Sequence, residues 1–306
     1  MKIRKVDDKN IGETKHWLRT ASTLMEALPY LRAFSGHTFV IKYGGNAMGD
    51  DELASDFARD VVLIKQVGVN PIVVHGGGPQ IGEMLKRVNI QSEFVDGLRV
   101  TDQESVDIVE MVLAGSINKH IVTSINEAGG KAIGLSGKDG RLIEARKLRR
   151  TKRDPDSNIE KILDLGYVGE PQKVNADVFK IFEGSDAIPV IAPIGVGSNG
   201  KTYNINADTA AGAIAEAVNA SKLLMLTDIA GVMNGEGELI SEMTRDEANR
   251  LFKTSAITGG MIPKLETCLH AMEGGVEAAH ILDGRVPHVL LLELFTQDGT
   301  GTKITL

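Results

Sequence analysis

From Thr38 onward, short apolar runs alternate with amphipathic segments, and this alternation constrains the fold more than any other feature. TFVIKY (38–43) precedes a helical pattern from about Glu52 to Val67, and PIVV (71–74) precedes another from about Pro79 to Val88. Short apolar runs bounded in this way are typical of buried strands, and strands joined by helices form parallel sheets covered on both faces. We therefore expect an α/β fold, a three-layer αβα sandwich with a mostly parallel central sheet.

Later segments continue the alternation. The expected strands are KAIGLS from residue 131, residues 187–194, TYNIN from residue 202 and residues 222–226. Two tetrapeptides, Thr101–Glu104 and Thr244–Glu247, have the form of a capping box, in which the first and fourth residues satisfy each other's backbone N–H groups. Each tetrapeptide therefore predicts the start of a helix.

An additional helix is expected ahead of the first strand, over residues 10–28. Its apolar stripe, at steps of three and four residues, consists of Leu18, Ala21, Met25 and Leu28. Pro29 is expected to end this helix, because proline lacks a backbone N–H. The stripe can pack on its own domain or on a second subunit, and the sequence leaves both arrangements open.

Composition restricts the class of function. The chain has 306 residues, of which 25% are charged, with a formal net charge of −7 and a pI near 5.6. This acidity argues against a general nucleic-acid binder, and we expect the basic run Arg146–Arg153 to be a solvated loop without a role. The histidines are scattered without metal-ligand spacing, so we expect no protein-built metal site. The chain has a single cysteine, Cys268, and no apolar run near the roughly 18 residues that a membrane span requires. Both features favour the cytoplasm.

Two glycine-rich loops follow the first two expected strands. The first loop is Lys42–Asn46 (KYGGN) and the second is His75–Pro79 (HGGGP). Glycines allow backbone N–H groups to approach an anion, and Pro79 suits the first turn of a helix whose N-terminus favours negative charge. Ligands of such sheets bind beyond the carboxyl ends of the strands, so both loops are expected to share one crevice. We interpret His75 as a hydrogen-bonded structural residue rather than a general base.

Residues 195–202 (GVGSNGKT) match the P-loop pattern G-x-x-x-x-G-K-[ST] literally. That pattern requires a helix directly after the loop, so that the helix N-terminus meets the phosphates. Here the alternating TYNIN reads as a strand, and a helix is expected only after Asp208. We therefore interpret residues 195–202 as a hairpin turn, and a P-loop kinase stays as the alternative fold.

Two further stretches carry groups suited to phosphate chemistry. Asn204, Asn206 and Asp208 stand at two-residue steps and share one face if the strand continues through them. Gly259–Lys264 (GGMIPK) is another glycine turn before an expected helix, and Lys264 would lie just inside that helix. A lysine at this point could reach a transferring phosphate.

These motifs occur in one order: VIKYGGNAM, VVHGGGPQI, DGLRVTD, YNINAD, LTDIAGV and GGMIPKLE. From about residue 25 to the C-terminus, the chain resembles the amino acid kinase family. The combination of HGGGPQI, GLRVTD and NINAD resembles the branch that phosphorylates N-acetyl-L-glutamate, rather than aspartate, carbamate or nucleotide-monophosphate kinases. The resemblance implies transfer of phosphate from ATP to the side-chain carboxylate of N-acetyl-L-glutamate.

The resemblance also implies residue roles. Lys42, Lys264 and Asp208 would be catalytic, with Asp208 orienting the two lysines. The acceptor would be held by Gly76, Gly77, Arg99, Asn204 and Asn206. The nucleotide would be held by Gly44, Gly45, Thr227, Asp228, Gly260 and Met261, and Mg²⁺ would be held mainly by its phosphates. An acceptor-binding lobe would then span residues 36–218 and a nucleotide-binding lobe residues 219–306.

The N-terminal helix and the tract from His280 to Thr302 resemble arginine-inhibited members of this family. The resemblance implies a homohexamer, a trimer of dimers joined by an N-terminal arm (residues 1–35). Arginine would bind Tyr30, Lys222, His280 and Glu293. A PII-type regulator, of the kind that binds some relatives, is a further expected partner. The alternative for residues 280–302 is ordinary strand and turn with a hairpin corner at Asp283–Gly284. The alternative function of a different class is a non-catalytic amino-acid sensor.

Overall fold

Helices occur wherever the sequence predicts one, and a helix over residues 289–295 is additional. A computed structural model of the protein describes residues 11–44, 48–95, 97–153, 160–253 and 259–305. The α-helices are α1 (Ile11–Phe34), α2 (Asp51–Gln66), α3 (Gly78–Arg87), α4 (Gln103–Glu110), α5 (Asn118–Glu127), α6 (Ala207–Ala217), α7 (Arg245–Lys253), α8 (Met261–Glu273) and α9 (Val289–Phe295). A π-helix, η3 (Met111–Ile117), joins α4 to α5, and two 3₁₀-helices are η4 (Asp139–Arg141) and η5 (Ala176–Phe182).

Eight strands form the central sheet, in the order β14-β16-β15-β13-β1-β2-β10-β5. They are β1 (Thr38–Tyr43), β2 (Asn70–His75), β5 (Lys131–Ser136), β10 (Ala187–Ala192), β13 (Lys222–Thr227), β14 (Glu242–Thr244), β15 (Ala278–Asp283) and β16 (Thr302–Thr305). All neighbouring pairs are parallel except β15 with β16. The sheet is therefore mostly parallel, as the sequence predicts.

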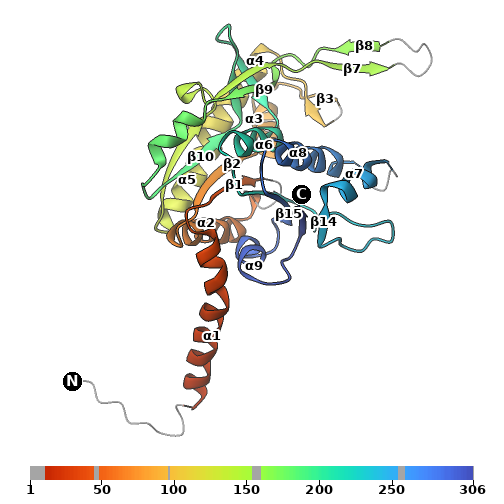
Figure 1. Ribbon diagram of the computed structural model, residues 1–306. Coiled ribbons are helices and arrows are strands. Elements are labelled where there is room, and N and C mark those ends of the chain that lie inside the picture. The colour runs from red at the N-terminus through yellow and green to blue at the C-terminus, as the bar shows by residue number, and fades with distance from the viewer. Residues whose placement is uncertain (1–10, 45–47, 96, 154–159, 254–258, 306) are drawn as a thin grey trace.

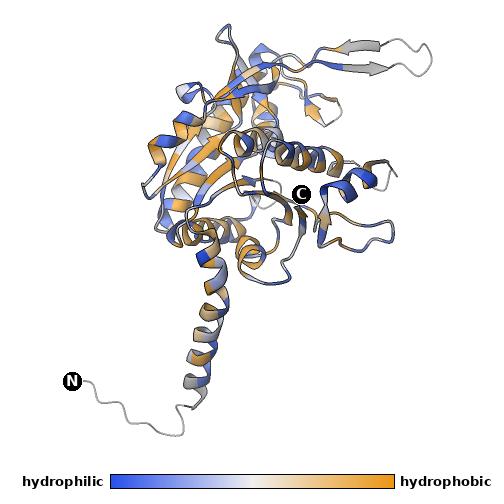
Figure 2. Cartoon of the chain, viewed as in Figure 1, coloured by the Kyte–Doolittle hydropathy of each residue, from blue (hydrophilic) through white to orange (hydrophobic). Residues whose placement is uncertain are grey.

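Helices cover both faces of this sheet (Figure 1). Side chains alternate along β1, so Val40 belongs to a core with α6 and α8, whereas Phe39 and Ile41 belong to a second core with α2, α5 and α9. Figure 2 shows the apolar strands between these helices. The three-layer αβα sandwich is confirmed.

The remaining strands lie outside the central sheet. Four of them pair as a closed barrel: β11 (Ile194–Val196), β12 (Thr202–Ile205), β9 (Val168–Val174) and β6 (Ile143–Lys147). Two hairpins complete the set: β3 (Phe94–Val95) with β4 (Leu98–Arg99), and β7 (Arg150–Arg153) with β8 (Glu160–Leu163). The basic run Arg146–Arg153 is thus not the expected loop, because backbone pairing of β6 with β9 and of β7 with β8 makes it mostly strand (Figure 1).

Helix α1 corrects the expected helix end at Pro29. The helix continues through Pro29 to Phe34. The added turn is anchored by packing, since the Phe34 ring lies 5.4 Å from that of Phe39 and 6.2 Å from that of Phe295. The rest of α1 projects from the body (Figure 1), with Leu18 65% and Met25 66% exposed. Packing of the stripe on its own domain, one of the two open arrangements, is therefore wrong.

Capping contacts define two other helix starts. Thr244 and Glu247 form the predicted capping box, with Thr244 N donating to Glu247 Oε2 at 2.8 Å and Glu247 N donating to Thr244 Oγ1 at 3.3 Å. At α4 the cap is Asp102, one residue later than Thr101, and its carboxylate accepts from Ser105 N at 2.8 Å.

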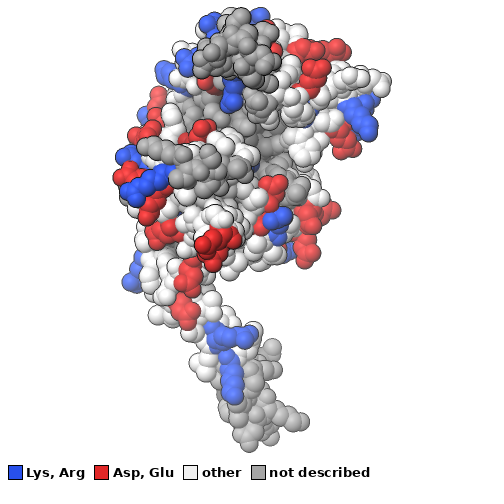
Figure 3. Space-filling view, turned by 90° about the vertical axis from the view of Figure 1, so that its right-hand side faces the viewer, with Lys and Arg blue, Asp and Glu red and all other residues white. Residues whose placement is uncertain are grey.

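Within the described ranges, no helix combines the length and apolar character that a bilayer crossing needs. On the face shown in Figure 3, acidic and basic side chains are interspersed. This face therefore carries charges of both signs.

Candidate active site

The two glycine loops lie side by side where β1 and β2 end. Tyr43 pairs with His75 in the parallel register, and Gly76 N donates to Tyr43 O at 2.8 Å. Gly44 and Gly76 line one cleft, which confirms the expected shared crevice. Gly45 lies outside the described residues.

This cleft gathers most of the predicted acceptor and catalytic residues, and we call it the acceptor cleft after that prediction. Its lining includes Lys42, Gly44, Gly76, Gly77, Arg99, Asn204, Asn206 and Asp208. Sequence reasoning missed its apolar walls, which include Phe94, Leu113, Val168 and Pro193. Leu113 lies in η3, and a π-helix interrupts the helical period that could have indicated its direction.

Asp208 joins the two predicted catalytic lysines. Lys42 comes from the end of β1, Asp208 from the first turn of α6 and Lys264 from the first turn of α8. Lys42 Nζ lies 3.0 Å from Asp208 Oδ1, and Lys264 Nζ lies 2.7 Å from Asp208 Oδ2. The three side chains are 8%, 16% and 11% exposed for Lys42, Lys264 and Asp208 respectively. We call this set the Lys–Asp–Lys bridge.

The bridge fixes the charge of its members. Burial of the Asp208 carboxylate would raise its pKa, but the charges and hydrogen bonds of Lys42 and Lys264 outweigh burial and hold that pKa below its ordinary value. The carboxylate is therefore ionised at neutral pH. With one carboxylate between two ammonium groups, the bridge carries a net positive charge and suits an anionic ligand.

Arg99 faces the acceptor cleft from strand β4. Its Nη2 donates to Gly78 O at 2.9 Å, its Nη1 donates to Ser92 Oγ, and its guanidinium lies 4.6 Å from the centroid of the Phe94 ring. These contacts hold a planar double donor of the kind that binds carboxylates in bidentate fashion. Burial lowers the Arg99 pKa, but a guanidinium stays charged at any physiological pH.

Two helix N-termini also reach the acceptor cleft. Gly77 precedes α3, and its missing Cβ is required, since a Cβ would lie 2.4 Å from Ile117 Cδ1. Asn206 caps α6, with its Oδ1 accepting from Asp208 N at 2.8 Å and from Thr209 N at 3.1 Å. The strand therefore does not continue through Asn204, Asn206 and Asp208: β12 ends at Ile205, and the cap turns the chain into the helix.

His75 is structural, as interpreted from the sequence. Its ring is buried, with Nδ1 2.9 Å from Gly76 O and Nε2 3.3 Å from Asn118 Nδ2. Because an amide N–H₂ can only donate, this network assigns the ring proton to Nδ1. Burial lowers the pKa of His75 to about 4, so the imidazole is neutral and both nitrogens are engaged.

Four of the predicted nucleotide residues, Thr227, Asp228, Gly260 and Met261, are not part of the acceptor-cleft lining. Thr227 ends β13 and is buried, and its Oγ1 donates to Asp228 Oδ1 at 3.2 Å. Gly260 and Met261 begin α8, the helix of Lys264. In the parts of the chain that the structure describes, no group of three or more His, Cys, Asp or Glu side chains is arranged to hold a metal ion.

The literal P-loop match is a hairpin. β11 and β12 are antiparallel, and Gly197 N donates to Lys201 O at 2.8 Å across the turn. No helix follows at Thr202, so the phosphate-binding geometry of a P-loop is absent from this segment. The alternative P-loop kinase is wrong.

The predicted arginine residues form a second polar cluster, the His280 cluster. His280 Nδ1 lies 2.6 Å from Glu293 Oε1, and Lys222 Nζ lies 3.4 Å from His280 Nε2. Lys222 Nζ also lies 5.1 Å from the centroid of Phe34, whose ring is 6.4 Å from that of Tyr30. The base of α1 thus meets this cluster. Helix α9 separates β15 from β16, so the alternative of a hairpin corner at Asp283–Gly284 is wrong.

Comparison with known proteins decides the family. The pattern of the amino acid kinase family matches residues 37–283. The chain belongs to this family. Acetylglutamate kinase of Rhodospirillum centenum is 64% identical over 95% of this chain and 95% of its own length, and that of Rhodospirillum rubrum is 65% identical over 94% and 93%. Acetylglutamate kinase of Parvibaculum lavamentivorans is 61% identical over 94% of each.

Solved structures of other proteins share the fold. N-acetylglutamate synthase from Neisseria gonorrhoeae, in complex with coenzyme A and N-acetyl-glutamate, matches 94% of this chain with a TM-score of 0.80 and 25% identity. This amino acid kinase chain spans 63% of the length of that synthase. Carbamate kinase from Giardia lamblia, bound to AMP-PNP, matches 88% of this chain and 98% of its own with a TM-score of 0.62 at 16% identity.

Proposed function

We propose that the protein transfers the γ-phosphoryl group of ATP to the side-chain carboxylate of N-acetyl-L-glutamate. The product would be N-acetyl-L-glutamyl 5-phosphate, formed in the second step of arginine biosynthesis. The observation that carries the proposal is the Lys–Asp–Lys bridge, of which Lys42 and Asp208 line the acceptor cleft. The names of relatives at 61–65% identity over nearly the whole chain support the choice of acceptor.

The acceptor cleft supplies donors for a dicarboxylate. In the proposal, Arg99 binds the α-carboxylate in bidentate fashion, and Asn204 with the amides near Gly76 and Gly77 holds the acetamido group and the reacting carboxylate. Asn206 contributes through α6, because its own side-chain oxygen already caps that helix. The side-chain carboxylate then points toward Lys42.

Charge is the main obstacle to this reaction. Two unit negative charges about 4 Å apart oppose each other by roughly 4 kcal/mol at an effective dielectric near 20. A carboxylate oxygen forms the new bond to the γ-phosphorus while the bond to the β-phosphate oxygen breaks and ADP leaves with its charge. The two lysines offset the charge on both sides of the transferred group. No proton is removed from the acceptor, so the neutral, fully engaged His75 needs no catalytic part.

The nucleotide is proposed to lie beyond Asp208, against the residues after Asn219. Gly44, Gly45, Thr227, Asp228, Gly260 and Met261 are the proposed contacts. Mg²⁺ would arrive with ATP, held by phosphate oxygens. The charge pattern supports this, because both oxygens of Asp208 face ammonium groups and are poor cation ligands. The lobes are then residues 36–218 for the acceptor and 219–306 for ATP.

Acyl phosphate is the readout that tests the proposal. Purified protein is incubated with Mg-ATP and N-acetyl-L-glutamate, and acyl phosphate is trapped with hydroxylamine, beside parallel reactions with glutamate, aspartate and carbamate. We expect hydroxamate from N-acetyl-L-glutamate alone. A silent reaction in protein that still binds ATP would refute the kinase proposal and favour the amino-acid sensor.

Regulation by arginine is a second part of the proposal. The His280 cluster is a buried acid–base pair joined to the base of α1, and its Glu293 also accepts from Thr300 N at 2.7 Å. We propose that arginine binds there, and that the exposed stripe of α1 joins dimers into a hexamer. Removal of residues 1–24 should abolish both the hexamer, measured by light scattering, and inhibition by arginine. If the truncated protein kept both the hexamer and the inhibition, the proposed role of the N-terminal arm would be refuted. A PII-type partner and a cytoplasmic location stay as expectations.

A further inference from the structure

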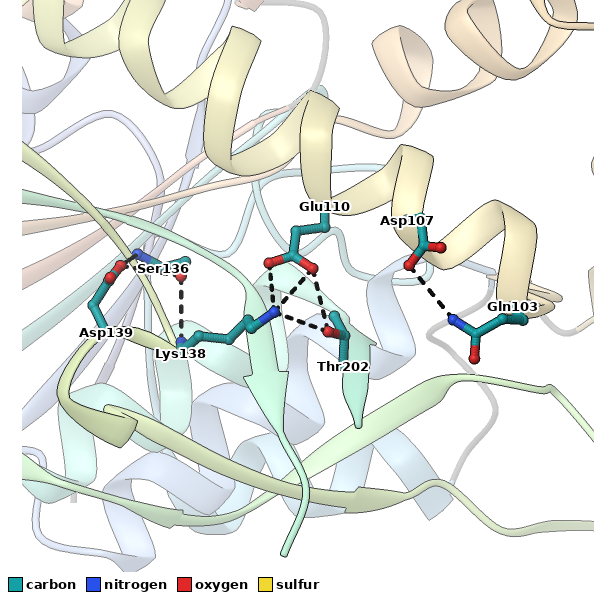
Figure 4. A network of polar contacts seen from close by, with 7 residues as sticks. All are labelled: Gln103, Asp107, Glu110, Ser136, Lys138, Asp139 and Thr202. Carbon is teal, nitrogen blue, oxygen red and sulfur yellow. Dashed lines mark hydrogen bonds and ion pairs between the residues drawn. The ribbon is translucent and has the colours of Figure 1, made fainter. Parts of the chain in front are cut away.

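Glu110, Lys138 and Thr202 form a closed ring of contacts (Figure 4). Lys138 Nζ lies 2.8 Å from Glu110 Oε1 and 3.1 Å from Glu110 Oε2, and it donates to Thr202 Oγ1 at 3.1 Å. Thr202 Oγ1 donates to Glu110 Oε2 at 3.2 Å. The three donors of the ammonium group and the single donor of the hydroxyl are thereby all used.

The ring ties together three elements that are distant in sequence. Glu110 is the last residue of α4, Lys138 lies in the connection after β5, and Thr202 is the first residue of β12. The backbone beside Lys138 is itself held, because Ser136 N and Oγ donate to Asp139 Oδ2 at 2.6 and 3.1 Å (Figure 4). The lysine therefore reaches the ring from a fixed base.

Two of these elements continue directly into the walls of the acceptor cleft. Thr202 and Asn204 stand two residues apart on β12, so they share a face, and Asn204 lines the acceptor cleft. Glu110 is followed by η3, whose Leu113 lines the same cleft. Leu113 also packs at Gly77, where a Cβ would lie 2.8 Å from Leu113 Cδ2. The ring thus sets the distance between the polar wall at Asn204 and the apolar wall at Leu113.

The ring gives the threonine of the literal P-loop match contacts that differ from those of a P-loop. The hydroxyl of Thr202, which would contact Mg²⁺ in a P-loop, is here committed to Glu110 and Lys138. We infer that Glu110, Lys138 and Thr202 are positioning residues that fix the width of the acceptor cleft and so set its affinity for the acceptor. This inference rests on the proposed function of that cleft.

The test separates acceptor binding from turnover in the full-length protein. Thr202→Val removes the hydroxyl at nearly constant volume, and Thr202→Ser keeps it. We expect Thr202→Val to raise the KM and the calorimetric Kd for N-acetyl-L-glutamate about tenfold, as expected for loss of one to two hydrogen bonds. The kcat and the KM for ATP should stay within about twofold, because the Lys–Asp–Lys bridge is untouched. Thr202→Ser should restore the acceptor KM.

Lys138→Met provides a second arm that does not open a buried cavity, since the Lys138 side chain is 37% exposed. It should reproduce the effect of Thr202→Val, and the double variant should not multiply the two effects, because both break one ring. Lys131→Met is the matched control, since it removes an exposed ion pair with Asp186 at 3.0 Å and should change nothing.

Three results would overturn the inference. They are an unchanged acceptor KM in both Thr202→Val and Lys138→Met, equal effects of Thr202→Val and Thr202→Ser on that KM, or a fall in kcat that accompanies the rise in acceptor KM. Failure of the proposed function has a different signature. Wild-type protein that binds the acceptor but yields no hydroxamate would refute the kinase proposal alone, and the Kd values of the variants would then decide whether the ring sets acceptor affinity.

Discussion

Replacing Asp208 with asparagine tests the Lys–Asp–Lys bridge directly. The amide has nearly the shape of the carboxylate, so Asp208→Asn removes charge with little change in volume. In the wild type, Asp208 Oδ1 and Oδ2 lie 3.0 Å from Lys42 Nζ and 2.7 Å from Lys264 Nζ. The variant would leave two buried ammonium groups facing each other across a neutral side chain.

The magnitude follows from these distances. At an effective dielectric near 20, one ion pair at such a separation has a gross attraction of about 5 kcal/mol, most of which desolvation offsets. Removal of one member of a buried pair typically costs about 3–5 kcal/mol of stability. If the transition state also loses about 3 kcal/mol of stabilisation, kcat falls by on the order of a hundredfold. The Asp208→Asn variant should therefore lose both turnover and unfolding free energy.

Hydroxamate kinetics measure the first effect, and chemical denaturation measures the second. Asp186→Asn is the matched control, because its ion pair with Lys131 has the same 3.0 Å length but both side chains are 72% exposed. That control should leave both stability and kcat nearly unaltered, because solvent screens an exposed ion pair. Near-normal kcat in Asp208→Asn would remove the bridge from the mechanism. Since the Asp208 pKa is depressed, its contribution to stability is present above about pH 4 and is lost as pH falls through the lower folded-state pKa.

Three further changes have outcomes that the structure specifies. Alanine at either lysine of the bridge, for example Lys264→Ala, should lower kcat by on the order of a hundredfold or more in the hydroxamate assay. Gly77→Ala should cost about 1–3 kcal/mol of unfolding free energy, because a Cβ there lies 2.4 Å from a side-chain carbon of η3; Gly78→Ala has open space and should be near neutral in the same denaturation experiment. His288 donates to the buried Asp60 at 2.7 Å, and that hydrogen bond raises the His288 pKa. His288→Ala should therefore lower stability by less than about 1 kcal/mol near pH 6.5, because the His288 side chain is 45% exposed and solvent screens its ion pair. The loss should be smaller at pH 9, since the stabilisation is lost as pH rises through the raised folded-state pKa; a pH-independent loss in denaturation curves would refute this.

The layers and the acceptor cleft could be predicted because their signals are local. The apolar runs of β1 and β2 are each followed directly by glycines, and parallel strands bring their carboxyl ends to one edge. The hairpin at residues 195–202 could be separated from a P-loop because alternation in TYNI continues past the motif. In both cases the deciding residues lie within a few positions of one another.

Features that depend on distant partners could not be predicted in the same way. Pro29 does not end α1, because packing of Phe34 on Phe39 and Phe295 stabilises one more helical turn. The residues next to Pro29 in the sequence do not indicate this packing. The same holds for Glu110, Lys138 and Thr202, three ordinary polar residues that come together from α4, from the connection after β5 and from β12. A motif such as GVGSNGKT specifies backbone freedom and side-chain types, but the element that follows decides what its last hydroxyl contacts. Here that element is β12, and the threonine that a P-loop would turn toward Mg²⁺ faces a carboxylate and an ammonium group instead.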